Sequence, residues 1–213
     1  MRLDHVSYAV SNNELSSTVQ RIGSMLNTAF EDGGIHPEFG TRNFICPLLN
    51  GQYIEVVCPL EHPATDITPF GKAVKQKALR GGGWLSWVVA MEDLTEIEEV
   101  MDRKAAHGHR IKPNKTNLTW QQIGVLNLID NPQLPFFIKW LSGSHPSGDQ
   151  KANSAIQKIN LFGQKKVLEN TLNFNLSLLP QINLIEASNL DNLEEIGIKS
   201  VVFETSSELI EIE

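Results

Sequence analysis

The sequence lacks the features that are typical of secreted or membrane-spanning proteins. Only two of its 213 residues are cysteines, Cys46 and Cys58, and they lack metal-type spacing with each other. The N-terminal MRLDHVSYAV alternates in polarity and carries Asp4 and His5, so it does not resemble a signal peptide. No stretch approaches the roughly 20 apolar residues of a membrane span. We therefore expect a cytoplasmic protein with no membrane partner and with two buried, reduced thiols.

Positive charge is also sparse. The chain has 18 Lys and Arg against 25 Asp and Glu, a formal net charge of −7, and its basic residues are scattered. Nucleic-acid binding calls for a concentrated basic face, so we expect no nucleic-acid partner. Motifs of other enzyme classes are missing too. GGGWLS is not followed by the Gly-Lys-Ser/Thr of a phosphate loop, there is no G-x-S-x-G elbow, and no Cys–His arrangement stands out.

The first 60 residues predict a β-α-β-β-β module. LDHVSYAV is rich in β-branched and aromatic residues, and the segment after it repeats apolar residues at helical spacing. Two further apolar runs flank Asn50-Gly51, which is a strong hairpin signal. The expected elements are strands at 3–10, 29–31, 41–49 and 51–60 and a helix at 14–26.

The same order begins again after a connector, residues 61–80, that holds a helical patch. An internal repeat offset by roughly 80 residues points to a duplicated fold. We expect strands at 81–91, 119–129 and 134–141 and a helix at 92–108. The predicted fold class is therefore α+β, with module one at 1–60 and module two at 81–141 forming one domain, 1–141.

The remainder is predicted to be a linker followed by a partial third module. Residues 142–154 are polar and rich in Gly and Ser, as in a flexible linker. Residues 155–213 suggest a strand, a helix and three strands, a partial βαβββ-like order that could pack on the sheet edge or mediate a homodimer.

Paired β-α-β-β-β modules resemble the vicinal oxygen chelate superfamily, which includes glyoxalase I and the extradiol dioxygenases. Three segments are similar to its bacterial glyoxalase-like branch: LDHVSYAV, with a His in the first strand; GGIHPEFGTRN…GQYIEVV, which resembles a His-Pro…Gly-Thr-x-Asn…Tyr-Leu-Glu pattern; and LPFFIKW. They span about residues 2–141. The resemblance implies a curved, cup-like mixed sheet around a cavity, with ligands of a divalent metal on the first and last strands of each module.

His5 and Glu55 stand at the metal-ligand positions of the first module. By register, Glu55 shares a strand face with Tyr53, and the resemblance favours the cavity over solvent for that face. In the second module Trp87 and Ile138 occupy the corresponding positions, and neither binds a metal. A complete four-ligand site is therefore excluded, and standard glyoxalase I activity is not expected.

His36 is the candidate replacement, because it lies on the loop that leads to the third strand. His5, His36 and Glu55 could bind Zn, Fe or Mn with open positions. The alternatives are that these three residues contact substrate directly without a metal, or that they are structural polar groups. In the metal-free case a His–carboxylate pair can still act as acid and base, with Glu55 as the proton-transfer base.

Other residues are candidates for substrate binding. Asn43 and Thr41 begin a strand behind Gly40, and tryptophans and phenylalanines of module two could wall an apolar pocket. His62 and His145, which precede prolines, and His107 and His109, at the expected helix end, are predicted to lie outside the site. The candidate substrate-binding residues are Asn43, Thr41, Tyr53, Trp87, Trp120 and Phe137.

Two functions remain open at this point. One is an enzyme, a lyase, isomerase or dioxygenase, acting on a small organic molecule with His5, His36 and Glu55 as catalytic residues. The other is a non-catalytic protein of the same fold that binds a hydrophobic or aromatic small molecule, as resistance proteins do.

Overall fold

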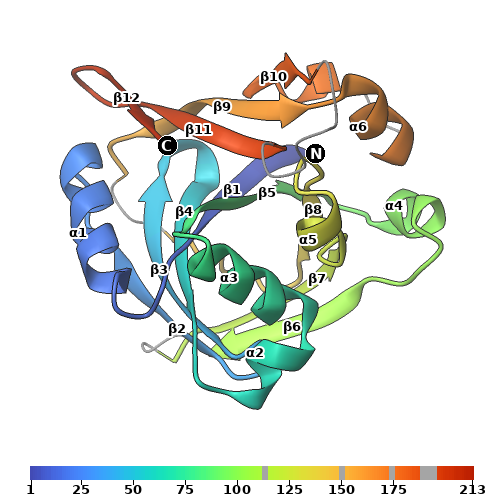
Figure 1. The fold of residues 1–213 in the computed structure, drawn as a ribbon, viewed down its shortest axis with the longest axis horizontal. Helices are drawn as coiled ribbons and strands as arrows, with labels where there is room; N and C mark the ends of the chain where they lie inside the picture. The colour runs from blue at the N-terminus through green and yellow to red at the C-terminus, as the bar shows by residue number, and fades with distance from the viewer. Residues whose placement is uncertain (112–114, 149–151, 173–175, 188–195) are drawn as a thin grey trace.

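Two β-sheets form the framework of the molecule in a computed structural model, which describes residues 1–111, 115–148, 152–172, 176–187 and 196–213. The larger sheet has eight strands in the order β2-β3-β4-β1-β5-β8-β7-β6, and the smaller has four in the order β10-β9-β11-β12. Figure 1 shows the larger sheet curling around a central space, with the smaller sheet across its outside. This mixed α+β architecture confirms the predicted fold class.

Module one has the predicted β-α-β-β-β order. Asn50 and Gly51 both take positive φ at the predicted hairpin, 62° and 65°, a backbone conformation that Asn and Gly tolerate best. The buried side chains of the helix recur along one face, which packs on the outside of the sheet. The elements are β1 (Arg2–Ala9), α1 (Leu15–Leu26), β2 (Glu31–His36), β3 (Thr41–Leu48), the short helix η1 (Leu49–Gly51) and β4 (Gln52–Pro59).

Module two departs from prediction at its helix. The helix expected at 92–108 ends at Val100, and Asp102 follows with a φ of 47°. The segment AHGHRI then forms a strand, because its exposed and buried residues alternate from His107 onward. The strand expected at 119–129 ends at Ile123. The elements are α2 (Pro63–Ile67) and α3 (Pro69–Leu79) in the connector, then β5 (Gly83–Ala90), α4 (Thr95–Val100), β6 (Ala106–Ile111), β7 (Asn117–Ile123), α5 (Asn127–Asp130) and β8 (Phe136–Trp140).

The eight-stranded sheet is symmetric about the seam between the modules. β1 pairs with β5 antiparallel at this seam, and each module pairs its first strand with its last in parallel, β1 with β4 and β5 with β8. The edge strands β2 and β6 approach each other at the bottom of Figure 1, where Arg110 of β6 hydrogen-bonds His36 of β2 at 2.8 Å. The sheet is therefore nearly closed, and residues distant in sequence meet inside it.

Residues 155–213 form the smaller sheet, which packs on the outer face of β5. The ring of Trp84 lies 6.2 Å from that of Phe203, and its Nε1 donates to the carbonyl of Ile212 at 2.8 Å. The element order matches the expected partial module, but β9 lies between β10 and β11, a pairing that neither module has. The elements are β9 (Ala155–Gly163), α6 (Lys165–Leu172), η2 (Leu176–Leu178), β10 (Ile182–Glu186), β11 (Gly197–Glu204) and β12 (Leu209–Ile212). Residues 149–151 of the expected linker and 173–175 of the expected helix lie outside the described residues.

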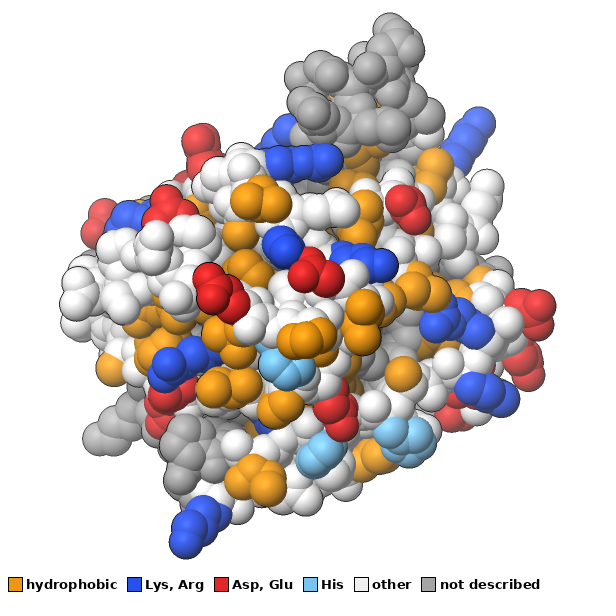
Figure 2. All heavy atoms as spheres, turned by 60° about the horizontal axis from the view of Figure 1, so that its bottom comes forward, with side chains coloured by type: hydrophobic (Ala, Val, Ile, Leu, Met, Phe, Trp, Pro, Cys, Tyr) orange, Lys and Arg blue, Asp and Glu red, His pale blue; other side chains and the backbone are white. Residues whose placement is uncertain are grey.

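Both cysteines are free and buried, as predicted, and burial raises the pKa of Cys46 to about 12. Within the described ranges, none of the helices is long and apolar enough to span a bilayer. On the face shown in Figure 2, Lys and Arg are scattered among acidic and apolar side chains.

Candidate active site

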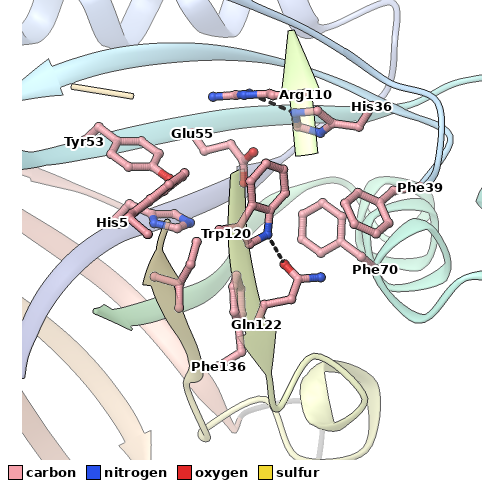
Figure 3. A pocket seen from close by; sticks show the side chains of 12 residues that line it. His5, His36, Phe39, Tyr53, Glu55, Phe70, Arg110, Trp120, Gln122 and Phe136 are labelled. Atoms are coloured by element: carbon pink, nitrogen blue, oxygen red, sulfur yellow. Dashed lines mark hydrogen bonds between the residues drawn. The ribbon is translucent and has the colours of Figure 1, made fainter. Parts of the chain in front are cut away.

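Both modules contribute side chains to a cavity inside the curled sheet (Figure 3). The volume that the centres of water molecules can occupy in this cavity is about 50 Å³. A cavity of this size holds a few waters or the reacting end of a small organic molecule. One side of the lining is polar and the other is aromatic. The lining residues are His5, His36, Phe39, Tyr53, Glu55, Phe70, Arg110, Trp120, Gln122, Phe136, Ile138 and Trp140.

Glu55 lines this cavity, as the sequence predicts, and is 7% exposed. Its Oε2 accepts a hydrogen bond from Ser7 Oγ at 2.8 Å, and its Oε1 accepts one from Asn43 Nδ2. Burial alone raises the pKa of Glu55, but electrostatic attraction to His5 and His36 and these two hydrogen bonds lower it overall. Glu55 is therefore a carboxylate at neutral pH whose two oxygens are already engaged.

His5 projects into the cavity beside Tyr53, and the two rings stack with centroids 4.3 Å apart. A β-bulge in β1 at Asp4 positions the imidazole: Leu3 pairs with Val89 of β5 and His5 with the adjacent Val88, so Asp4 is an extra residue. Leu3 consequently packs in the outer core, whereas His5 and Ser7 face inward. The His5 Nδ1 lies 2.9 Å from Asp4 Oδ2.

Asp4 is fully buried, and no sequence pattern marked it as a site residue. Burial raises its pKa, but hydrogen bonds from His145 and His5 outweigh burial and hold the pKa far below its ordinary value. Oδ2 also accepts from Trp140 Nε1 at 3.3 Å, and Oδ1 is 2.8 Å from the Arg2 guanidinium and 3.1 Å from His145 Nε2. The Asp4 carboxylate, which stays ionised, therefore accepts a hydrogen bond from Nδ1 of His5 and keeps the imidazole proton on that nitrogen. The lone pair of the neutral ring is then on Nε2, the nitrogen that can accept a proton.

His36 lies across the cavity and is held by Arg110. A guanidinium has no acceptor, so the 2.8 Å contact requires His36 Nε2 to accept from Arg110 and places the imidazole proton on Nδ1, 3.3 Å from Thr41 Oγ1. Burial, and then the charge of Arg110, lower the pKa of His36 to about 4. His36 is therefore neutral at pH 7, and Thr41 supports it from behind.

Arg110 is the main functional residue that the sequence analysis missed. It sits in β6, whose first residues belong to the helix expected at 92–108 and which was not predicted as a strand, and only the alternation of HGHRI could have indicated its inward face. Its NH1 also donates to Asn43 Oδ1 at 3.0 Å. Gly108 precedes it on the same face, where a Cβ would lie 2.4 Å from the indole of Trp120, so glycine permits this close packing.

The residues predicted as metal ligands do not form a suitable donor set. Among the described residues there is no group of three or more His, Cys, Asp or Glu that could hold a metal ion. His36 Nε2 is committed to Arg110, and Ser7 and Asn43 already hold the oxygens of Glu55. A guanidinium beside these donors also opposes a divalent cation.

The predicted substrate-binding residues divide between the cavity and the core. Tyr53 and Trp120 line the cavity, and Asn43 and Thr41 lie just behind it. Trp87 and Phe137 are fully buried in the outer core, and Trp87 Nε1 donates to the Gln133 carbonyl at 3.0 Å. His145, expected outside the site, contacts Asp4, whereas His107 and His109 are exposed as expected, although on a strand.

The depressed pKa of His36 predicts a specific pH dependence of stability. Between pH 4 and 6.5 the unfolded chain binds the proton and the folded chain does not, so stability rises with pH there. From pH 7 to pH 5 we expect wild type to lose about 2 kcal/mol of unfolding free energy through this residue. Urea unfolding at several pH values measures it. His36→Gln should flatten the curve, and the control His107→Gln at an exposed site should not. An unchanged slope in His36→Gln would contradict the assignment.

The duplicated βαβββ sheet and its inward-facing polar cluster define the class of the protein: it has the vicinal oxygen chelate fold. The family model described as "Glyoxalase-like domain" matches residues 3–168, and the chain belongs to that family. The match extends past residue 141, where the three sequence motifs end, into β9 and α6.

Solved structures resemble the chain in fold at low sequence identity. A hypothetical protein from Staphylococcus aureus is 14% identical, with a TM-score of 0.62, over 97% of this chain and 92% of that one. This likeness shows shared fold alone, including the C-terminal sheet. Methylmalonyl-CoA epimerase from Mycobacterium tuberculosis is 14% identical with a TM-score of 0.42, over 65% of this chain and 86% of that one. No curated protein matches the sequence.

Proposed function

We propose that the chain is an isomerase or lyase that transfers a proton on a small organic molecule, using its own side chains and no metal ion. The observation that carries the proposal is the His5–Asp4 pair, in which a buried carboxylate holds Nδ1 of an imidazole that lines the cavity. This is the arrangement by which a carboxylate fixes the tautomer of a general base and stabilises its protonated form.

The proposed reaction begins at a C–H bond next to a carbonyl. Nε2 of His5 takes the proton, and the electron pair of the C–H bond moves into the carbonyl to form an enolate. The developing negative charge on oxygen is stabilised by the Arg110 guanidinium, the fixed cation of the cavity. Return of the proton to another face or atom completes an isomerisation, and loss of a leaving group from the enolate completes an elimination.

In this proposal His5, rather than Glu55, is the base. A carboxylate whose pKa is lowered and whose oxygens accept from Ser7 and Asn43 is weakly basic. Glu55 instead positions Asn43, which in turn holds Arg110. The dioxygenase alternative is less well supported, because the donor set around His5, His36 and Glu55 does not suit iron.

Deuterium exchange tests the assignment without knowledge of the natural substrate. A panel of small carbonyl compounds is incubated in D₂O with the protein, and incorporation next to the carbonyl is followed by proton NMR. We expect exchange of at least one compound, retained after chelator treatment, and a loss of about 10²- to 10⁴-fold in His5→Gln.

Glu55→Gln is the matched comparison, since it removes the other candidate base from the same cavity. Exchange that survives His5→Gln but stops in Glu55→Gln would return the base role to Glu55. Exchange abolished by chelator and restored by Zn, Fe or Mn would contradict the metal-free mechanism.

A non-catalytic binding protein is the second candidate, supported by the aromatic wall of Phe39, Phe70, Trp120 and Phe136. Ligands that quench tryptophan fluorescence with no exchange across the panel would favour it. The expected cytoplasmic location and homodimer stay predictions.

A further inference from the structure

Arg110 is a buried cation without an acidic partner in the described part of the chain. It is 5% exposed, and no Asp or Glu oxygen of the described residues lies within 4.0 Å of its nitrogens. A guanidinium keeps its charge at any physiological pH, so it cannot lower the cost of burial by losing a proton. Buried charges are normally paired, and an unpaired one facing a cavity indicates an anionic ligand.

The neighbours of Arg110 hold it in place and leave its charge uncompensated. His36 Nε2 and Asn43 Oδ1 both accept from NH1, and both are neutral groups. Asn43 also stands between Arg110 and Glu55, because its Nδ2 donates to the carboxylate of Glu55. The two carboxylate oxygens of Glu55 thus accept hydrogen bonds from Ser7 and Asn43, and Glu55 forms no ion pair with Arg110.

The rest of the cavity limits the kind of anion. Its other wall is aromatic, with Phe39 and Phe70 edge to face at 5.9 Å and with Trp120 and Phe136 beside them. One guanidinium matches the two oxygens of a carboxylate, whereas a phosphate dianion would meet a single cation and the nearby carboxylate of Glu55. The small free volume further favours a compact, flat molecule.

We propose that the cavity binds organic monocarboxylates, with the carboxylate on Arg110 and a flat apolar body against Phe39, Phe70, Trp120 and Phe136. This inference names the substrate class of the reaction proposed above and rests on that site. The carboxylate itself, or a carbonyl next to it whose oxygen also contacts the Arg110 guanidinium, then presents the reacting carbon to His5.

Benzoate and benzamide form a matched probe pair, since they share shape and differ in charge. Their Kd values are measured by calorimetry, with quenching of Trp120 as a second readout, in wild type, Arg110→Met, Arg110→Lys and the surface control Arg80→Met. In wild type and Arg80→Met we expect benzoate to bind about tenfold more tightly than benzamide, a modest value for one charge-assisted pair.

Arg110→Met should remove this preference, and Arg110→Lys should retain part of it because the charge stays while the planar fork is lost. Thermal unfolding shows whether each variant folds. Arg110→Met should remain folded, and benzoate should raise the Tm of wild type and Arg80→Met but not that of Arg110→Met. Equal Kd values for the two probes in wild type, no benzoate binding at about 10 mM, or a preference that persists in Arg110→Met would each overturn the proposal.

The variant His5→Gln distinguishes failure of the carboxylate-binding proposal from failure of the proton-transfer proposal. A benzoate preference that depends on Arg110 and is intact in His5→Gln, with no deuterium exchange in any carboxylate, would establish the ligand class and reject the catalysis. Exchange of neutral carbonyl compounds without any benzoate preference would do the reverse.

Discussion

Asp4→Asn is expected to lower the rate of deuterium exchange by about 10²- to 10⁴-fold while the protein still folds. All four groups around this carboxylate present hydrogens to it: His5 Nδ1, Trp140 Nε1, the Arg2 guanidinium and His145 Nε2. An asparagine amide can accept on one side only and directs its own hydrogens at the donors on the other. Either His5 changes tautomer or it loses the negative charge that stabilises its protonated form.

The control for Asp4→Asn is Asp66→Asn, which removes an exposed carboxylate paired with Lys75. Exchange rates are compared over a range of pH, because removal of the anion beside the proposed base should change the pH profile of exchange. The stability cost of Asp4→Asn, measured by urea unfolding, should be on the order of 3 kcal/mol, as for removal of one partner of a buried charge cluster. Wild-type exchange and an unshifted pH profile in Asp4→Asn would reject the positioning role of Asp4.

Phe203→Ala is expected to lower the free energy of unfolding by about 3–5 kcal/mol, the cost of a large cavity in a core. Phe203 is fully buried in β11 and faces Trp84 of β5, so its ring joins the C-terminal sheet to the outer face of the larger sheet. Because Trp84 also donates to the backbone of Ile212, the two sheets share both apolar and polar contacts.

Phe162→Ala provides the comparison, since Phe162 is half-buried in the neighbouring strand β9 and packs under Lys199. Its loss should cost about 1 kcal/mol. Chemical denaturation followed by Trp84 and the other tryptophans should show one transition in each protein, shifted strongly only in Phe203→Ala. A separate early transition for the C-terminal sheet, or equal costs for the two variants, would mean that residues 155–213 form an independent unit.

Most helices and strands could be predicted from the sequence because their signals come from residues that are close together in the chain. The Asn50-Gly51 turn, the apolar spacing of α1 and the β-branched runs of β1 and β4 each depend on neighbours within one element. β6 was missed because the acidic run TEIEEV begins a helix and nothing before Asp102 signals how soon it ends. The alternation that follows in HGHRI is too short to outweigh a helical interpretation on its own.

The site was predicted where it depends on strand position and missed where it depends on tertiary geometry. Glu55 and Tyr53 face the cavity because alternation along β4 is regular. Asp4 was missed because a bulge in β1 gives two consecutive residues a role near the cavity, and a bulge leaves no mark in the sequence. Arg110 was missed because it reaches His36 only after the edges of the sheet approach each other.

Trp87 illustrates the limit of aligning one module on the other. Between Ser86 and Trp84 the pairing of β5 with β1 shifts at Leu85, which changes the face that the following residues occupy. Trp87 therefore joins Trp84 and Val89 in the outer core, whereas Leu85 and Val88 pack inside. A shift of one residue exchanges the two faces of a strand, so equivalent positions in two aligned modules need not share a direction.

The symmetric sheet surrounds a site that has no symmetry. Module one supplies His5, His36 and Glu55, and module two supplies Arg110, Trp120 and Phe136. A cup assembled from two identical one-module chains would carry every substitution twice, so an arginine gained on one side would also appear opposite itself. Joining both modules in one polypeptide removes that constraint, and each half can acquire or discard a chemical group independently. A single chain can thus hold a base and a cation at opposite sides of one small space, with neither duplicated.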